Sequence, residues 1–385
     1  MPEIGQNLLL EAAKHSCLQI RGRLDAALAV GGRILMANGI GRRTFMQLGA
    51  AAGAVGLSRV GSQAATLTRK IALEEHFSTP ELVKRGLVAR PTNSDVLFAD
   101  IERRLADFDD LRLASMDAAG IDLSVLSVTT PGIQGMTDAK EAVALAQVTN
   151  DLLAGVVQKR PRRYGGFAVL PLQDPAAAAA ELQRCVKDLG FKGALINGQT
   201  EGHYLDDDQY LSFWERAHDL DVPVYLHPGL LPDKPAMFAG RPELDGPVWA
   251  WTADTGAHAL RLIFGGTCKR FPRLKIILGH MGETLPYLLW RLDSRYQLQV
   301  GKTLDVDDRP SAIFRRNFVI TTSGVFDPAP LAAAIATVGE DSILFSVDYP
   351  YEDSSAAAAF VDGAPLSDAT RAKICSGNAR RVLHL

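Results

Sequence analysis

Short apolar runs alternate with helical segments along the chain from residue 69 onward, and this alternation restricts the fold more than any other feature. The runs are rich in aliphatic and β-branched residues and lack strict polar alternation, as expected for strands that are covered on both faces. We predict strands at 70–75, 123–128, 166–170, 193–196, 222–226, 275–278, 318–322 and 343–347. Eight such strands, each followed by a helical segment, predict an α/β fold of the closed (β/α)8 barrel type.

Apolar residues at three- and four-residue spacing predict helices between these strands, for example at 175–188, 207–219, 255–264 and 284–297. Two insertions interrupt the repeat, after the first strand (79–113) and after the fifth (229–254). Insertions at the carboxyl ends of barrel strands cover the active-site mouth. The second insertion contains Trp249 and Trp251, whose rings either sandwich a flat substrate or pack the insertion against the barrel.

The composition and net charge of the chain indicate which classes of binding partner to expect. The chain has 385 residues, 47% hydrophobic and 22% charged, with a formal net charge of -3, which suits one barrel with insertions. Nucleic acids and anionic membranes usually require a basic surface. We therefore expect a small-molecule substrate and no nucleic-acid partner.

Residues 1–64 have the features of an export leader, and 65–385 contain the barrel. The pair Arg42-Arg43 precedes a mildly apolar run at 49–57, then Arg59 and the small-residue stretch 62–64. This order is typical of a twin-arginine signal, which predicts a periplasmic protein that is free of the membrane after processing. The alternative is a helical extension with a chance arginine pair on a cytoplasmic protein.

Candidate metal ligands stand at the ends of three predicted strands. Glu74 and His76 close the first strand, and alternation places their side chains on one face. His227 ends the fifth strand and Asp348 ends the eighth. Because the carboxyl ends of barrel strands converge on one mouth, these residues are expected to meet. Their mixed nitrogen and oxygen donors suit Zn or Mn.

The end of the fourth strand limits the number of metal ions. Residues 193–197 read GALIN, without a lysine that could be carbamylated and bridge two ions. One divalent ion is therefore expected.

His280 ends the sixth strand, and Glu283 follows in the first turn of the next helix. A carboxylate at this spacing holds the imidazole tautomer and raises its basicity, so the pair is a candidate for proton transfer. Arg291, two turns along, either binds a substrate carboxylate or pairs with a surface acid. For the isolated histidines we expect surface or core roles; they are His203, His218, His258 and His384.

Four segments together resemble the amidohydrolase-related (amidohydrolase 2) family of metal-dependent decarboxylases. They are 71–77 (IALEEHF), 225–228 (YLHP), 279–283 (GHMGE) and 348–350 (DYP). The most similar branch contains the γ-resorcylate (2,6-dihydroxybenzoate) and 2,3-dihydroxybenzoate decarboxylases. Hydrolytic relatives usually begin with His-x-His, whereas this chain has Glu-x-His.

The resemblance implies a role for each matched residue. Glu74, His76, His227 and Asp348 would hold the metal, His280 with Glu283 would handle protons, and Arg291 would bind substrate. It also implies a homodimer or homotetramer.

The expected reaction is reversible, non-oxidative loss of CO2 from a hydroxybenzoate. Asp348 is the candidate donor of a proton to the ring carbon that carries the carboxylate, and no organic cofactor is needed. Two alternatives remain: a metal-dependent hydrolase of a lactone, ester or amide, with Asp348 or His280 as base, and a non-catalytic periplasmic binding protein.

Overall fold

The computed structural model describes residues 68–385, apart from residues 232 and 234. The strands of the described chain are β1 (Lys70–Phe77), β2 (Ile121–Val128), β3 (Tyr164–Gly166), β4 (Ala194–Asn197), β5 (Val224–His227), β6 (Ile276–Leu278), β7 (Phe318–Thr321) and β8 (Ile343–Leu344). Arg42, Arg43 and the rest of the predicted export signal lie outside the described residues.

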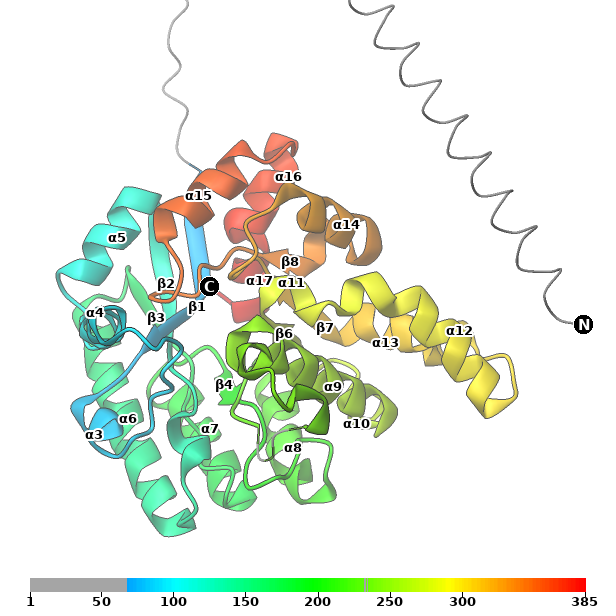
Figure 1. The fold of residues 1–385 in the computed structure, drawn as a ribbon, viewed down its shortest axis with the longest axis horizontal. Helices are drawn as coiled ribbons and strands as arrows, with labels where there is room; N and C mark the ends of the chain where they lie inside the picture. The colour runs from blue at the N-terminus through cyan, green and yellow to red at the C-terminus, as the bar shows by residue number, and fades with distance from the viewer. Residues whose placement is uncertain (1–67, 232, 234) are drawn as a thin grey trace, which may run out of the picture. The chain divides into compact units, whose positions relative to one another are not determined.

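Neighbouring strands pair in parallel throughout, in the orders β1-β2-β3 and β4-β5-β6-β7-β8. Two isolated parallel bridges, Ala168 with Ala194 and Glu75 with Tyr349, join these two sets at both seams. The strands therefore close into a barrel, which the helices surround in Figure 1. The predicted (β/α)8 fold is confirmed.

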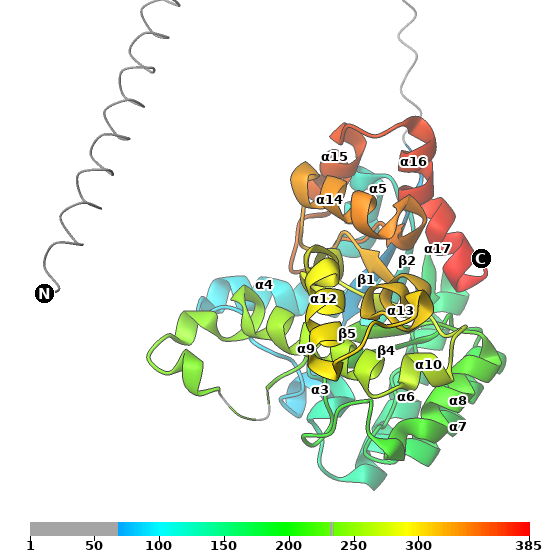
Figure 2. The same ribbon diagram turned by 90° about the vertical axis from the view of Figure 1, so that its right-hand side faces the viewer.

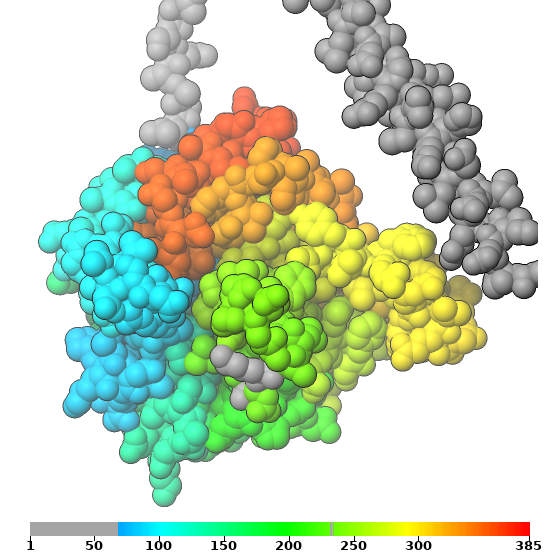
Figure 3. All heavy atoms as spheres, viewed as in Figure 1, coloured from blue at the N-terminus to red at the C-terminus, as the bar shows by residue number. Residues whose placement is uncertain are grey.

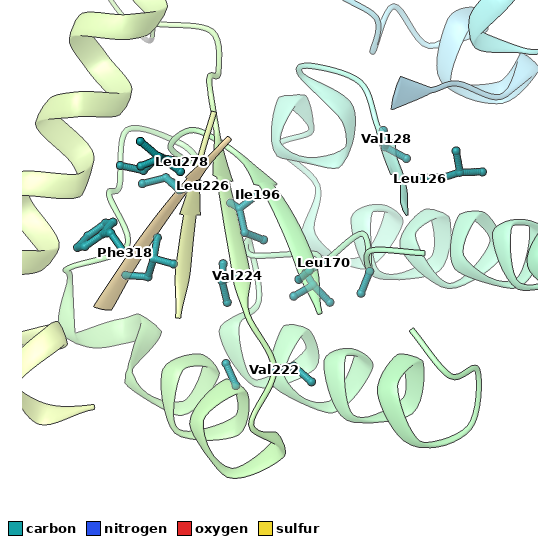
Figure 4. Packing of buried hydrophobic residues seen from close by; sticks show 14 of the residues in the cluster. Leu126, Val128, Leu170, Ile196, Val222, Val224, Leu226, Leu278 and Phe318 are labelled. Carbon is teal, nitrogen blue, oxygen red and sulfur yellow. The ribbon is translucent and has the colours of Figure 1, made fainter. Parts of the chain in front are cut away.

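Each strand is buried on both faces, which explains its continuous apolar sequence. Ile71 and Leu73 of β1 pack inside the barrel with Phe167 and Tyr225. Their neighbour Ala72 belongs to the larger core between strands and helices, part of which is drawn in Figure 4. Alternate residues thus fill two separate cores.

Helices follow the strands and cover the barrel. They are α3 (Pro80–Lys84), α4 (Asp95–Leu105), α5 (Leu111–Ala119), α6 (Ala139–Lys159), α7 (Pro175–Lys187), α8 (Leu211–Leu220), α9 (Ala250–Phe264), α10 (Thr267–Arg270), α11 (His280–Glu283), α12 (Leu289–Val300), α13 (Pro310–Asn317), α14 (Pro328–Val338), α15 (Ser354–Gly363), α16 (Asp368–Ala372) and α17 (Asn378–Leu383). Asp138 and Asp174 cap α6 and α7 by accepting backbone N–H bonds. Within the described residues, no helix has the length and apolar character needed to cross a membrane.

Two predicted helices begin later than expected. The segment predicted at 207–219 is a 3-10 turn, Asp208–Tyr210, followed by α8, and the segment predicted at 284–297 is a 3-10 turn, Leu285–Leu288, followed by α12. Thr284 is left-handed, with φ of 64°, so the α-helix starts only after this turn.

β3 and β8 differ most from their predicted lengths, because amides that would continue them bind other partners, such as Val169 N–H with Asn150 Oδ1. β3 stops at Gly166, and pairing beyond it is limited to Ala168. β8 has two residues, because Phe345 N–H donates to the carbonyl of Ile374 and Val347 N–H donates to the Glu75 carboxylate.

Both insertions lie at the same end of the barrel. The first contains α3 and α4, and the second contains short 3-10 turns before α9. Figure 2 shows α4 and the chain leading into α9 projecting from one side. In Figure 3 the second insertion (light green) lies over the middle of this face, beside the first insertion (blue to cyan), and residues of both line one cavity. The predicted cover of the mouth is therefore present.

Candidate metal centre

Four side chains from three strand ends meet at the mouth of the barrel. They are Glu74 and His76 of β1, His227 at the end of β5, and Asp348 after β8, and their ligand atoms all lie within 4.8 Å of one another. His76 Nε2 is 3.2 Å from Asp348 Oδ1, and His227 Nε2 is 3.2 Å from Glu74 Oε1. Convergence of distant strand ends thus brings the four predicted ligands together.

A β-bulge in β1 aims Glu74 and His76 into the mouth. Ile71 and Leu73 point inward, so simple alternation would send residue 75 inward as well. The pairing with β2 shifts between Ala72 and Glu75, where β1 gains one extra residue. This change of phase turns Glu74 and His76 toward the other ligands.

Both histidines have Nδ1 close to a polar neighbour outside the cluster and Nε2 close to a carboxylate of the cluster. His227 Nδ1 lies 2.9 Å from Asn197 Oδ1, 2.9 Å from the Pro228 carbonyl and 3.1 Å from Thr130 Oγ1. His76 Nδ1 lies 3.3 Å from Ser127 Oγ. These partners hold each ring with Nε2 toward the carboxylates, as hydrogen bonds to the opposite ring nitrogen commonly do for metal-binding histidines.

Glu74 is fully buried, and its neighbours favour the ionised form. Burial opposes its charge, yet His280 and His227 hold the pKa of Glu74 far below its ordinary value. Tyr225 and Ser323 donate hydrogen bonds to Oε2. Burial, together with the Glu74 carboxylate, raises the pKa of Tyr225 well above its ordinary value, so the phenol remains a donor.

Several buried atoms of this cluster have no hydrogen-bond partner within the described part of the chain. They are Glu74 Oε1, His76 Nε2 and Asp348 Oδ1. Burying unpaired polar atoms is costly. Burial, with a contribution from the neighbouring His227 ring, lowers the pKa of His76, which favours the neutral form that binds metals. These donors therefore fit a divalent cation.

His280 and Glu283 form the predicted pair beside this cluster. His280 Nδ1 lies 2.7 Å from Glu283 Oε1, and its Nε2 lies 3.5 Å from Glu74 Oε1 and 3.6 Å from Asp348 Oδ2. Burial opposes the charged ring, but Glu283 and Glu74 raise the pKa of His280 well above its ordinary value. The pair is thus suited to hold and transfer a proton.

A cavity of about 340 Å³ opens over the cluster. His227, His280 and Asp348 line it, together with Trp251 of the second insertion. The other lining residues are Pro91, Thr92, Ile101, Thr129, Thr130, Pro228, Pro247, Thr252, Gly324, Tyr351 and Glu352. No lysine or arginine lines the cavity among the described residues, so an anionic ligand would rely on the cation site.

Comparison with known proteins identifies the family. The amidohydrolase family model matches residues 91–385. The chain belongs to the amidohydrolase family. It is 44% identical to a γ-resorcylate decarboxylase from Rhizobium sp., over 82% of this chain and 98% of that protein.

The chain is also similar to solved structures of decarboxylases that act on dihydroxybenzoates. A 2,6-dihydroxybenzoate decarboxylase complexed with 2,6-dihydroxybenzoate is 43% identical, with a TM-score of 0.78, over 83% of this chain and 100% of the other. A dihydroxybenzoic acid decarboxylase from Polaromonas sp. JS666, with bound manganese and the inhibitor 2-nitroresorcinol, is 43% identical, with a TM-score of 0.76, over 83% and 97%.

Two predicted residues of this amidohydrolase lie apart from the cluster. Arg291 is exposed on α12 and does not line the cavity, so its substrate-binding role stays a prediction. Of the two tryptophans in the second insertion, Trp251 lines the cavity, whereas Trp249 is 45% exposed.

Three residues that orient the ligands were not predicted from the sequence. Asn197, Tyr225 and Ser323 contact His227 or Glu74 directly. Asn197 is the last residue of β4, and Ser323 follows β7. The metal ligands were predicted because they are polar residues at the carboxyl ends of strands. Asn197 and Ser323 occupy positions of the same kind, so the same rule could have identified them.

Proposed function

We propose that this amidohydrolase is a metal-dependent decarboxylase that releases CO2 from a hydroxybenzoate. The observation that carries the proposal is the cluster of Glu74, His76, His227 and Asp348, of which His227 and Asp348 line a cavity large enough for one aromatic ring. The similarity to γ-resorcylate decarboxylase over nearly that whole protein supports the same chemistry. We propose 2,6-dihydroxybenzoate, or a closely related ring, as substrate.

The four side chains are proposed to bind one divalent ion, Mn or Zn. Two carboxylates and two imidazoles suit either metal, and manganese is bound in the Polaromonas relative. When bound at these four side chains, such an ion would supply Lewis-acid chemistry that offsets the negative charge of the substrate.

Asp348 is the proposed proton donor. Its carboxyl group lies beside the cluster and lines the cavity, so it can reach the ring carbon that carries the carboxylate. A proton moves from Asp348 to that carbon. The bond to the carboxylate then breaks, CO2 leaves, and the electron pair of the broken bond restores the aromatic ring.

His280 and Glu283 are proposed to supply a new proton to Asp348 after each turnover, because the first proton stays on the product ring. His280 Nε2 faces Asp348 Oδ2 at 3.6 Å, while Glu283 holds the opposite ring nitrogen at 2.7 Å. The carboxylate fixes the ring orientation and stabilises its charged form. This relay needs no organic cofactor.

Activity assays on metal-loaded protein test the proposal. CO2 release is measured with 2,6- and 2,3-dihydroxybenzoate, and benzoate serves as the control that lacks an ortho hydroxyl. We expect CO2 from a hydroxybenzoate and none from benzoate. Hydrolysis of a lactone, ester or amide panel without any CO2 release would instead identify a metal-dependent hydrolase.

We also propose export to the periplasm through the Arg42-Arg43 pair and assembly as a homodimer or homotetramer. Cell fractionation of the natural chain and of the Arg42→Lys, Arg43→Lys variant tests export, since only the natural chain should reach the periplasm. Equal distribution of the two chains would contradict it. Sedimentation analysis gives the subunit number.

A further inference from the structure

Three consecutive residues after β4 contact one face of α9. Tyr204 OH donates to Asp254 Oδ1 at 2.5 Å, and Leu205 N–H donates to His258 Nε2 at 2.9 Å. Asp206 accepts from Arg261 Nε at 2.6 Å. The α9 residues stand at positions i, i+4 and i+7, which share one face of a helix.

The two contacts nearest the start of α9 are shielded from water. Asp254 is 8% exposed and His258 is fully buried. The Tyr204 ring also packs edge-on against the His258 ring, with a centroid distance of 4.9 Å. A hydrogen bond in such a place restricts movement more than one on the surface, because breaking it leaves a buried polar group unpaired.

Residues at the start of α9 line the cavity. Trp251 and Thr252 line the cavity, and Asp254 lies less than one turn further along. The chain before α9 does little to fix the position of the helix start, because its 3-10 turns are not packed into the core. Neither Pro242–Leu244 nor Gly246–Val248 contains a buried residue. No side chain caps the helix at Trp249.

The residue that precedes the segment after β4 orients a proposed metal ligand. It is Asn197, the last residue of β4, whose Oδ1 lies 2.9 Å from His227 Nδ1. Seven residues further, the chain reaches Tyr204 and the first contact with α9. One stretch of chain therefore connects the cation site to the helix that carries Trp251.

We propose that Tyr204 and Asp254 are positioning residues that hold the Trp251 ring at a fixed place over the metal centre and so set the affinity for the aromatic ligand. This inference rests on the proposed function. Neither residue lines the cavity, so their effect passes through α9. The position of Trp251 should govern ring binding, whereas proton transfer depends on Asp348 and should be little changed.

Tyr204→Phe tests the proposal by removing one hydroxyl. Binding of 2-nitroresorcinol to the Mn-loaded protein is measured by calorimetry, which needs no turnover. Loss of one such hydrogen bond should weaken binding about five-fold and raise KM similarly, with kcat within about two-fold. Asp254→Asn keeps an acceptor for Tyr204 and should bind nearly as tightly as the natural chain.

A matched control separates positioning from stability. Tyr164 is also buried, and its hydroxyl donates to the carbonyl of Phe108 at 2.6 Å, away from α9. Tyr164→Phe should lower Tm without changing the Kd for 2-nitroresorcinol. If both variants changed Tm alone, Tyr204 would be only a structural residue and the proposal would be wrong.

A double-mutant cycle tests whether Tyr204 affects ligand binding through Trp251. In a Trp251→Ala background, Tyr204→Phe should have no further effect on binding, because the group that it positions is absent. Additive effects would overturn the proposal. Failure of the natural chain to release CO2, with intact ligand binding and a five-fold loss in Tyr204→Phe, would contradict the proposed reaction and leave the positioning role supported.

Discussion

The hydroxyl oxygen of Ser346 accepts the backbone N–H of Glu74 at 2.6 Å, across the seam where β8 meets β1. It also accepts the N–H of Leu73 at 3.0 Å. These two amides lie within the bulge that turns Glu74 toward the cation site. One side chain therefore stabilises the backbone on which two proposed ligands depend.

Ser346→Ala should weaken both folding and metal binding. It leaves two buried amides without an acceptor, so the free energy of unfolding should fall by about 2 to 3 kcal/mol. Urea unfolding of metal-free protein measures this loss, and Mn titration measures affinity. Ser354→Ala, which removes another buried hydroxyl bonded to Ser115, is the control and should leave Mn affinity unchanged.

Tyr225→Phe should reduce metal affinity more than activity. The variant removes the hydroxyl that donates to Glu74 Oε2, and loss of such a partner typically lowers metal affinity by roughly 10- to 100-fold. With saturating Mn, kcat should recover most of its value. An unchanged Mn affinity would show that this contact does not support the ligand, and Tyr164→Phe again serves as the control.

Asp348→Asn should abolish most of the decarboxylation while keeping the metal. The amide retains an oxygen ligand but cannot donate the carboxyl proton, so kcat should fall by about 10² to 10⁴. Metal analysis of the purified variant is measured alongside CO2 release. Full activity with the metal in place would exclude Asp348 as the donor.

His258 should make the protein less stable in acid. Burial, with a smaller contribution from Arg261, lowers the pKa of His258 from 6.5 to about 3. The unfolded chain then binds more protons between these values, so stability falls as pH drops through that range. From pH 7 to pH 5 the loss from this residue should be about 2 kcal/mol.

His258→Gln isolates this effect, because glutamine can accept the Leu205 N–H bond but does not titrate. Urea unfolding of metal-free protein at the two pH values should give a smaller acid loss in the variant than in the natural chain. Equal losses in both would show that His258 is not the group responsible.

The sequence predicts the barrel well because burial on both faces leaves a strong and simple signal. The strand ends are less well predicted, since Phe345 and Val347 look like strand residues but bind Ile374 and the Glu75 carboxylate instead. Such contacts depend on residues distant in sequence. Local pattern cannot reveal them.

The candidate site can likewise be predicted from the sequence only in part. Convergence of strand ends predicts the meeting of Glu74, His227 and Asp348, and three-residue spacing predicts the pair of His280 with Glu283. Nothing in residues 71–77 indicates the extra residue of the bulge, which is held by Ser346 near the other end of the chain. The Tyr204 contact with α9 likewise joins two segments that show no local signal.

Stepwise addition of Mn to metal-free protein, with CO2 release from 2,6-dihydroxybenzoate measured at each step, tests the central claim most directly. Activity should be absent at the start, rise linearly and stop rising at one ion per chain, and His227→Ala should need far more metal. Full activity without metal, or no activity with one tightly bound ion per chain, would contradict the account.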